Sequence, residues 1–315
     1  MVPAEPVIAL PVVVLAAALL IDRCIGDPHS PLHPVALLGR FIAWWGKPER
    51  YTAGLQRAAG IIFWFVTVFV FAIPAFLFRE FAPWYLYLLI APVLLKCCFA
   101  WRSLEEHALA VIEALKQGTE AGRERVKVLV SRDTTALSRD HILSAAYESM
   151  TENLTDSIVS PIFYYSLFGL AGAAAYRAAN TLDAMLGYRD KRERLGWWSA
   201  GMDDIFNFIP ARITVLFLFI WFAFRGRLTP SYRMMQRDKK RRPGYNGGIV
   251  MAAMAGGAGV MFEKPGVYTI GDGGRSLEEG GREILSAVRA VTLMAALAAG
   301  GTLILLGTWI NSMGI

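Results

Sequence analysis

The chain has 315 residues, of which 55% are hydrophobic and 18% are charged, and its net charge is +6. Soluble domains carry about a quarter charged residues and just under half apolar residues. The composition therefore excludes an ordinary water-exposed surface and indicates an integral membrane protein. Three cysteines without metal-like spacing, Cys24, Cys97 and Cys98, are interpreted as small buried side chains.

Apolar runs define the predicted membrane elements. A helix needs about 20 residues to cross the hydrocarbon layer of a bilayer. The clearest runs are 60–78 and 290–310. Shorter or interrupted runs are 7–21, 81–95, 157–176 and 205–224. The sequence thus predicts an all-α integral membrane protein with four to six membrane helices, folded as a single membrane-embedded catalytic unit over residues 1–315.

The first run, 7–21, is predicted to be a retained helix rather than a signal peptide. An acid, Glu5, stands where a basic n-region belongs, and no small-x-small cleavage site precedes Asp22. Directly after this run, Asp27-Pro28 and His33-Pro34 are dipeptides typical of turns. Taken alone, they indicate a structured loop.

An amphipathic segment follows the apolar run 81–95. Leu104, Ala108, Val111 and Leu115 fall at helical spacing among acidic and basic residues. This pattern predicts a helix on the cytoplasmic face of the membrane. Glycines 118 and 122 interrupt it, and a second helix is expected to begin within 124–130.

Three carboxylates then occur at i,i+4 spacing. A helix turns 100° per residue, so Glu148, Glu152 and Asp156 lie within about 80° of one another. Like charges at this spacing destabilise a helix, and a divalent cation such as Mg²⁺ relieves the repulsion. Taken alone, the motif is more typical of a solvated acidic helix face than of a metal site.

Further polar residues stand at the ends of the next two apolar runs. They are Arg177, Asn180, Asp183, Tyr188, Arg189, Asp203, Asp204, Asn207 and Arg212. Acids, amides and arginines are costly at the ends of membrane segments and usually face a polar cavity. The arginines could instead anchor the chain at lipid phosphates.

Eight basic residues crowd into 225–242, directly after the apolar run that ends at Phe224. Such a cluster marks the cytoplasmic side of a span and attracts anionic lipid, so we expect contact with the bilayer and none with nucleic acid. The segment 244–283 is rich in glycine and is expected to form cytoplasmic loops. It contains neither standard phosphate-binding glycine motif.

A resemblance to a known family rests on the following motifs, in chain order: Gly26-Asp27-Pro28, His33-Pro34-Val35, Gly39-Arg40, Glu148-Ser149, Glu152-Asn153, Asp156, Pro161, Phe163-Tyr164, Tyr176-Arg177, Asn180-Thr181-Leu182-Asp183, Gly187-Tyr188-Arg189, Asp203-Asp204, Asn207, Ile209-Pro210-Ala211-Arg212, Ala252-Ala253-Met254-Ala255-Gly256 and Glu263-Lys264-Pro265-Gly266. Together they resemble the membrane-bound adenosylcobinamide-phosphate synthase of cobalamin biosynthesis. One stretch, 242–248, departs from the family's S-P-N-A-G-like pattern, so no role is transferred to Asn246.

The resemblance implies an ATP-dependent ligase that joins adenosylcobyric acid to 1-amino-2-propanol or its O-phosphate, with ATP and Mg²⁺ as cofactors. The implied catalytic residues are Glu148, Glu152, Asn153, Asp156, Asn180 and Asp183. The implied substrate-binding and phosphate-binding residues are Asp27, His33, Arg177, Tyr188, Arg189, Asn207, Arg212, Glu263 and Lys264. Candidate metal ligands are Glu148, Glu152, Asp156, Asp183, Asp203 and Asp204.

A single site requires that the run 157–176 does not span the bilayer, because motifs at its two ends would otherwise face opposite sides. We therefore expect a segment that is re-entrant or lies in a protein-lined groove, which is allowed where non-spanning backbone is buried in protein. The implied protein is a multi-pass protein of the inner membrane with its active site facing the cytoplasm, and other cobalamin-pathway enzymes are candidate partners.

Two alternatives remain open from the residues. A membrane prenyltransferase holds Mg-diphosphate with acidic motifs, and Asn180 with Asp183 superficially suits one. A transporter also places acids in broken helices near the bilayer, although no inverted repeat is visible here.

Overall fold

The structure is a computed structural model that describes residues 4–27, 30–31 and 33–313. The chain forms two compact units, each built from separate stretches of sequence. Unit 1 comprises Met1–Ala100, Ser160–Phe206 and Ala295–Ile315, and unit 2 comprises Trp101–Val159 and Asn207–Met294. The two units interleave along the sequence. A single catalytic unit over residues 1–315 therefore stays a prediction.

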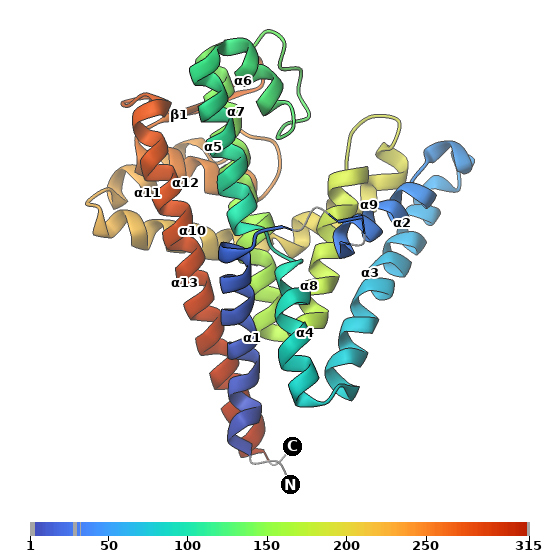
Figure 1. The fold of residues 1–315 in the computed structure, drawn as a ribbon. Helices are drawn as coiled ribbons and strands as arrows, with labels where there is room; N and C mark the ends of the chain where they lie inside the picture. The colour runs from blue at the N-terminus through green and yellow to red at the C-terminus, as the bar shows by residue number, and fades with distance from the viewer. Residues whose placement is uncertain (1–3, 28–29, 32, 314–315) are drawn as a thin grey trace. The chain divides into compact units, whose positions relative to one another are not determined.

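Unit 1 is helical. Its elements are α1 (Ala4–Cys24), α2 (Pro34–Trp45), the short helix η1 (Pro48–Arg50), α3 (Gln56–Phe81), α4 (Trp84–Lys96), α8 (Ser160–Leu186), α9 (Glu193–Phe206) and the last part of α13 (Leu277–Ser312) (Figure 1). Helix α3 packs against α8 and α9, and α1 packs against α4. The core between α2, α3 and α8 includes Ile42, Trp45, Trp64 and Leu182, all nearly inaccessible to solvent.

The chain reverses direction within α8 at Gly169. This glycine has φ 63° and ψ −155°, a conformation that only glycine adopts readily. As a result, the rings of Tyr164 and Tyr176 stack with their centroids 5.2 Å apart, whereas twelve residues of straight helix extend about 18 Å. The two arms of α8 therefore fold back on each other, which supports the predicted re-entrant course of 157–176.

Unit 2 contains the amphipathic, basic and glycine-rich segments of the sequence. Its elements are α5 (Trp101–Gln117), α6 (Thr119–Val126), α7 (Arg139–Leu154), the π-helical turn η2 (Thr155–Val159), α10 (Phe208–Phe224), α11 (Leu228–Asp238), α12 (Gly247–Ala258), β1 (Met261–Lys264), β2 (Tyr268–Gly271) and the start of α13. Helix α12 packs against α10 and α11. A Cβ at Gly257 would lie 2.1 Å from the ring of Phe222, so the glycine allows α12 to lie close to α10.

The membrane prediction is confirmed. Within the described residues, four helical stretches are long and apolar enough to cross a membrane, or up to five if α9 and α10 form one broken span. They are Gln56–Phe81, Trp84–Gln117, Arg139–Leu186 and Leu277–Ser312. The third contains the reversal at Gly169. The protein is therefore a multi-pass helical membrane protein.

Two expectations about the polar segments are corrected. The amphipathic helix is present as α5, with Ala108, Val111 and Leu115 buried. The next helix begins at Thr119 rather than within 124–130, because Gly118 adopts a positive φ of 137° and serves as its N-cap. The glycine-rich segment does not consist only of loops. It contains α12 and an antiparallel hairpin of β1 and β2, with Gly266 at positive φ in the turn.

Candidate functional site

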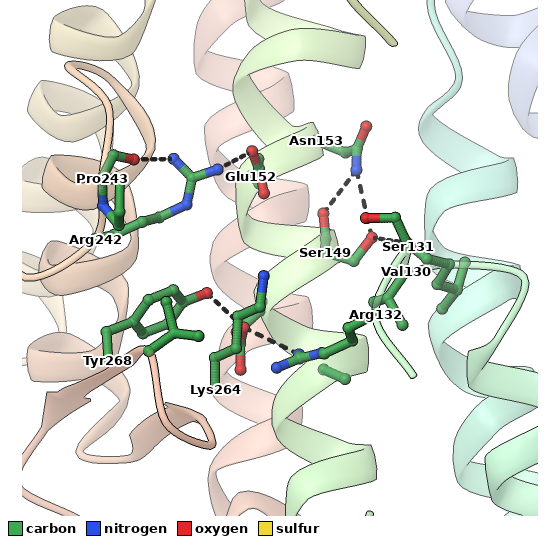
Figure 2. A pocket seen from close by; sticks show the side chains of 14 residues that line it. Val130, Ser131, Arg132, Ser149, Glu152, Asn153, Arg242, Pro243, Lys264 and Tyr268 are labelled. Atoms are coloured by element: carbon green, nitrogen blue, oxygen red, sulfur yellow. Dashed lines mark hydrogen bonds and ion pairs between the residues drawn. The ribbon is translucent and has the colours of Figure 1, made fainter. Parts of the chain in front are cut away.

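One face of α7 lines a cavity of about 390 Å³ in unit 2 (Figure 2). Ala145, Glu148, Ser149, Glu152 and Asn153 recur at three-residue and four-residue intervals, so they share this face. The remaining walls come from 129–132, from 242–243 and from the β1–β2 hairpin. The sequence motif at 148–153 thus becomes one wall of a polar pocket.

Glu148 is buried and fully hydrogen-bonded. Its Oε1 accepts from Ser144 Oγ at 2.5 Å, and its Oε2 accepts from Tyr268 Oη at 2.7 Å and from Arg132 Nη2 at 3.1 Å. The Nη1 of Arg132 is also buried and has no hydrogen-bond partner among the described residues. Glu148 therefore holds an arginine whose second nitrogen remains able to donate to a ligand.

Glu152 is more accessible, with 38% of its side chain exposed, and it forms an ion pair with Arg242. Asn153 donates through Nδ2 to the carbonyl oxygen of Ser149 at 2.9 Å. Asp156 does not line the cavity. It lies in η2, where the π-helical turn changes the angle between successive side chains and breaks the predicted alignment of three carboxylates.

The hairpin brings two polar side chains to the cavity. Lys264 at the end of β1 pairs in register with Tyr268 at the start of β2, and both line the cavity. Burial and the neighbouring Glu148 carboxylate raise the pKa of Tyr268, so its hydroxyl remains a donor. Glu263, the preceding strand residue, is not among the lining residues and lies 3.3 Å from His141 Nε2.

The charges around the cavity favour an anion. Three cations, Arg132, Arg242 and Lys264, face two carboxylates, Glu148 and Glu152. Lys264 forms no salt bridge within the described part of the chain. A phosphate or a carboxylate is the type of ligand that such arginine and lysine donors bind.

Arg212 and Asn207 also belong to unit 2. Arg212 Nη1 donates to Asn246 Oδ1 at 2.7 Å and to the carbonyl oxygen of Phe208 at 2.9 Å. Arg212 lines a second cavity rather than the cavity at α7. Asn207 is buried directly before α10. Asn246, to which no role was transferred from the family, thus positions a predicted phosphate-binding arginine.

A second group of predicted site residues lies in unit 1, on α8 and α9. Asn180 Nδ2 donates to Asp203 Oδ1 at 3.2 Å, and Asp204 follows on the same helix. Asp183 lies near the end of α8, where a Cβ at Gly187 would be 1.9 Å from its Oδ1. The structure therefore brings together Asn180 and Asp203, as the resemblance implies.

Beyond α8, the remaining predicted residues of this region lie near the surface. Tyr188 is partly exposed, and its ring stacks with the guanidinium of Arg192 at 4.1 Å. Arg189 is exposed.

The N-terminal motifs also lie in unit 1. Asp27 forms an ion pair with the buried Lys96, and Pro28 lies outside the described residues. His33 caps α2, because its Nδ1 accepts from the amide of Val35 at 3.3 Å. Burial lowers the pKa of His33, and the charges of Lys96 and Arg177 lower it further against the opposing effect of Asp27. His33 is therefore a neutral capping residue at neutral pH.

Arg177 lines a different, largely apolar cavity of about 300 Å³ in unit 1, with Leu38, Phe71 and Leu170 among its neighbours. Its Nε is buried without a hydrogen-bond partner among the described residues. A buried cation in the wall of an apolar cavity is consistent with the predicted binding role.

The predicted metal ligands are divided between the two units, and within the described residues no three His, Cys, Asp or Glu side chains converge in a way that could hold a metal ion. Both acids at the α7 cavity are already paired with arginines. Mg²⁺ commonly binds to one or two carboxylates together with substrate phosphates. The acids present fit a magnesium ion that arrives with a phosphate ligand, and they do not form a preassembled metal site.

Several pocket residues were missed by sequence reasoning. Arg132 and Ser131 lie in an irregular segment without periodicity, and Tyr268 follows a glycine turn that read as a loop. Arg242 was grouped with the basic residues beside the membrane. No signal in a single sequence distinguishes the arginine that bonds Glu152 from its basic neighbours.

Comparison with known proteins shows the family to which this chain belongs. The family model described as CobD/Cbib protein matches residues 15–295. The probable cobalamin biosynthesis protein CobD of Methanothermobacter thermautotrophicus is 41% identical over 302 residues, which covers 93% of this chain and 98% of that relative. The chain belongs to the CobD/Cbib family.

Other relatives agree with this membership. The probable cobalamin biosynthesis protein CobD of Thermococcus kodakarensis is 43% identical and covers 80% of this chain and 82% of its own length. The cobalamin biosynthesis protein CobD of Dehalococcoides mccartyi is 36% identical, with coverage of 82% and 86%. The CobD/Cbib chain described here is thus a protein of cobalamin biosynthesis. No solved structure matches it.

Proposed function

We propose that this CobD/Cbib protein is an ATP-dependent ligase that joins the propionate carboxylate of adenosylcobyric acid to the amine of 1-amino-2-propanol or of its O-phosphate. Family membership and the motif resemblance support the pathway and the substrates. The observation that carries the chemistry is the anion-binding character of the α7 cavity, where the unpartnered Nη1 of Arg132 and the amine of Lys264 accompany Arg242.

A carboxylate does not react with an amine at a useful rate, because its hydroxide leaving group is poor. Transfer of the γ-phosphoryl group of ATP to the carboxylate makes an acyl phosphate, whose phosphate leaves readily when the amine attacks. Magnesium bound to the nucleotide neutralises phosphate charge during such a transfer. The products are the amide, ADP and inorganic phosphate.

The residues of the cavity have separate tasks in this scheme. Arg132 and Lys264 bind the carboxylate and then the acyl phosphate through charge-assisted hydrogen bonds. Glu148 holds Arg132 in place, and both of its carboxylate oxygens already accept hydrogen bonds from the protein. Glu152, which is the more exposed acid, accepts the proton that the aminopropanol ammonium group must lose before its nitrogen can attack.

The active site is placed on the cytoplasmic side, where ATP is available. The basic residues that follow α10 support this orientation, because excess Lys and Arg beside a span marks the cytoplasmic face. Other enzymes of cobalamin biosynthesis are candidate partners for delivery of the corrinoid.

Substitution of Glu152 tests the proposal. Purified protein in detergent, supplied with ATP, Mg²⁺, adenosylcobyric acid and aminopropanol phosphate, should form adenosylcobinamide phosphate and ADP in equal amounts. Glu152→Gln should lower turnover by about 10²-fold or more, the usual contribution of a general base, and should leave the melting temperature nearly unchanged. Wild-type turnover in Glu152→Gln would reject the role of this residue, and ADP release without amide product would reject the ligase.

A further inference from the structure

A second cavity in unit 2, of about 600 Å³, is lined by four cations and by no carboxylate. The cations are Arg212, Lys239, Lys240 and Arg242. Apolar side chains of Val215, Met235 and Ile249 complete the wall together with Pro243, Gly244 and Tyr245. A cavity with this lining favours a ligand that carries several negative charges and also has an apolar part.

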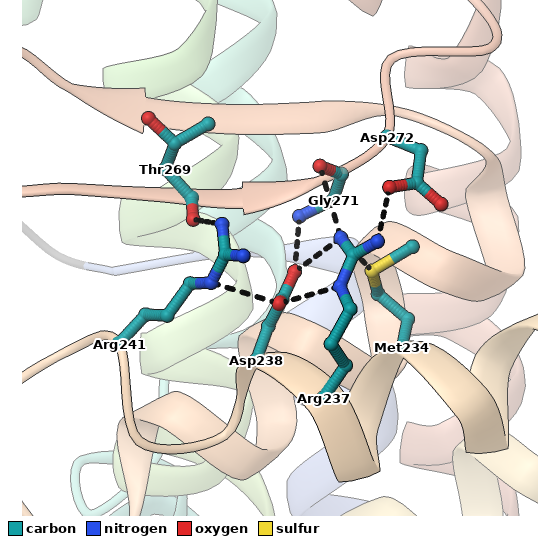
Figure 3. A network of polar contacts seen from close by, with 7 residues as sticks. All are labelled: Met234, Arg237, Asp238, Arg241, Thr269, Gly271 and Asp272. Atoms are coloured by element: carbon teal, nitrogen blue, oxygen red, sulfur yellow. Dashed lines mark hydrogen bonds and ion pairs between the residues drawn. The ribbon is translucent and has the colours of Figure 1, made fainter.

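The cations of this cavity are held apart from the acid next to them in sequence. Asp238 is fully buried and directs its carboxylate to the hairpin, where it accepts from the amide of Gly271 at 2.9 Å (Figure 3). Arg237 and Arg241 pair with the same carboxylate at 2.8 and 2.9 Å. The end of the basic segment is therefore divided: Arg237 and Arg241 bond Asp238 beside the hairpin, whereas Lys239, Lys240 and Arg242 line the cavity.

The four cations of the cavity differ in whether an acidic side chain neutralises their charge. Lys239 Nζ donates to Gln236 Oε1 at 2.8 Å, a neutral partner. Arg212 is bonded to Asn246 and to backbone oxygens, so its position is fixed while its charge is not neutralised. Lys240 is exposed and forms no salt bridge within the described residues. Among these four cations, Arg242 alone has an acidic partner in the part of the chain that the structure describes, and that partner is Glu152.

Arg242 and Pro243 line both cavities of unit 2. An anion bound in the basic cavity and a carboxylate bound in the α7 cavity would therefore meet at Arg242. Helix α12 begins at Gly247 beside this wall and adds the positive end of its dipole to the field of the four cations. This arrangement suits transfer of a phosphoryl group from one ligand to the other.

We propose that the basic cavity binds the triphosphate of a nucleotide, with its terminal phosphate directed toward Arg242. The inference rests on the proposed function, since it names the donor site of that reaction. In the transfer, the bond between the γ-phosphorus and the β,γ-bridging oxygen breaks, and its electron pair leaves with ADP. A new bond forms between the γ-phosphorus and a carboxylate oxygen held in the α7 cavity. Because Arg242 lines both cavities, its guanidinium is next to the transferred phosphoryl group before and after the transfer.

Anionic lipid headgroups carry the same phosphate chemistry, so the test must separate them from a nucleotide. The dissociation constant of ATP is measured by calorimetry on purified protein in nanodiscs of zwitterionic lipid, with Mg²⁺ and without corrinoid. Lys240→Gln and Lys239→Gln should each weaken ATP binding about tenfold, the effect of losing one charge-assisted contact. Arg233→Gln is the matched control, because Arg233 is exposed on α11, the helix that directly precedes the two lysines, and does not line the cavity.

The outcomes distinguish this site from the proposed function. Glu152→Gln should bind ATP at least as tightly as the wild type, because the substitution removes the acidic partner of Arg242, even though its turnover is lowered. If the lysine variants bind ATP like Arg233→Gln while the wild type makes the amide, the ligase stands and the donor site lies elsewhere. If ATP binds in a lysine-dependent way but no amide forms, the nucleotide site stands and the ligase fails. Lysine-dependent binding of vesicles that contain phosphatidylglycerol, without ATP binding, would overturn the nucleotide site.

Discussion

The two glutamates on α7 have different surroundings, although they stand one helical turn apart. Glu148 is buried and accepts three side-chain hydrogen bonds, whereas Glu152 is partly exposed and has Arg242 as its ion-pair partner. The first arrangement stabilises a buried polar network, and the second keeps a carboxylate accessible to a substrate. Equal spacing in the sequence therefore hides two separate roles.

Replacement of Glu148 by Gln should destabilise the protein. The substitution leaves the Arg132 guanidinium, whose side chain is 13% exposed, without its charged partner. Removing one member of a buried ion pair typically costs about 3 kcal/mol or more. Thermal unfolding in detergent should show a lowered midpoint for Glu148→Gln and no shift for the exposed Glu113→Gln. Equal midpoints for the two variants would show that Glu148 does not hold the network together.

At the scale of elements, the hairpin and α11 are joined by Asp238. Burial raises the pKa of this acid, but hydrogen bonds from Arg237 and Gly271 and the charges of Arg237 and Arg241 lower it more, so the net pKa falls below the usual value. The stabilising contribution is thus fully present above the pKa of the unfolded chain, about 3.9, and is lost as the pH falls through the lower folded value.

The prediction for Asp238 concerns acid stability. Wild-type protein should lose stability as the pH is lowered from about 5 to below 4, where the unfolded chain binds the proton first. Asp238→Asn should be less stable at neutral pH and should show a shallower loss over this range. Unfolding midpoints measured across the range would contradict the assignment if both proteins gave parallel curves.

The reversal in α8 depends on Gly169. A side chain there would adopt a strained backbone conformation and would place its Cβ 2.9 Å from Arg79 Nη1. Gly169→Ala should therefore lower the free energy of unfolding by about 1–3 kcal/mol. Gly201→Ala on α9 is the control, since a Cβ meets nothing within 4 Å there and alanine favours a helix. Equal stability of the two variants would argue against a tight turn at Gly169.

The sequence predicted elements better than it predicted contacts. Long apolar runs identify α3 and α13, and amphipathic spacing identifies α5, because burial and membrane length impose these patterns over many residues. The β1–β2 hairpin was missed, since strands of four residues are too short to show a period. The π-helical turn at η2 was also missed, and it moves Asp156 away from the cavity.

The candidate site was predicted only in part. Glu148, Glu152, Asn153 and Lys264 do line one cavity. Their partners Arg132 and Tyr268 come from segments far along the chain, and only tertiary folding brings them to α7. Spacing within one helix can predict a shared face, but it cannot predict which cation will neutralise it.

At the scale of the whole molecule, the two units alternate along the sequence. Each unit holds part of the residues that the family resemblance assigns to one site. Unit 2 holds the α7 cavity and the basic cavity, which contain the groups that the proposed carboxylate activation would use. Unit 1 contributes Asn180 and Asp203 on α8 and α9. We propose that the protein activates a carboxylate with ATP before it forms an amide.

Isotope transfer tests this claim most directly. Adenosylcobyric acid labelled with ¹⁸O in its free propionate carboxylate is incubated with purified protein, ATP, Mg²⁺ and aminopropanol phosphate, and the released inorganic phosphate is analysed by mass spectrometry. An acyl phosphate passes one carboxylate oxygen to phosphate, so one ¹⁸O atom should appear in each phosphate released from fully labelled substrate. Amide formation with unlabelled phosphate would contradict activation of the carboxylate by phosphoryl transfer.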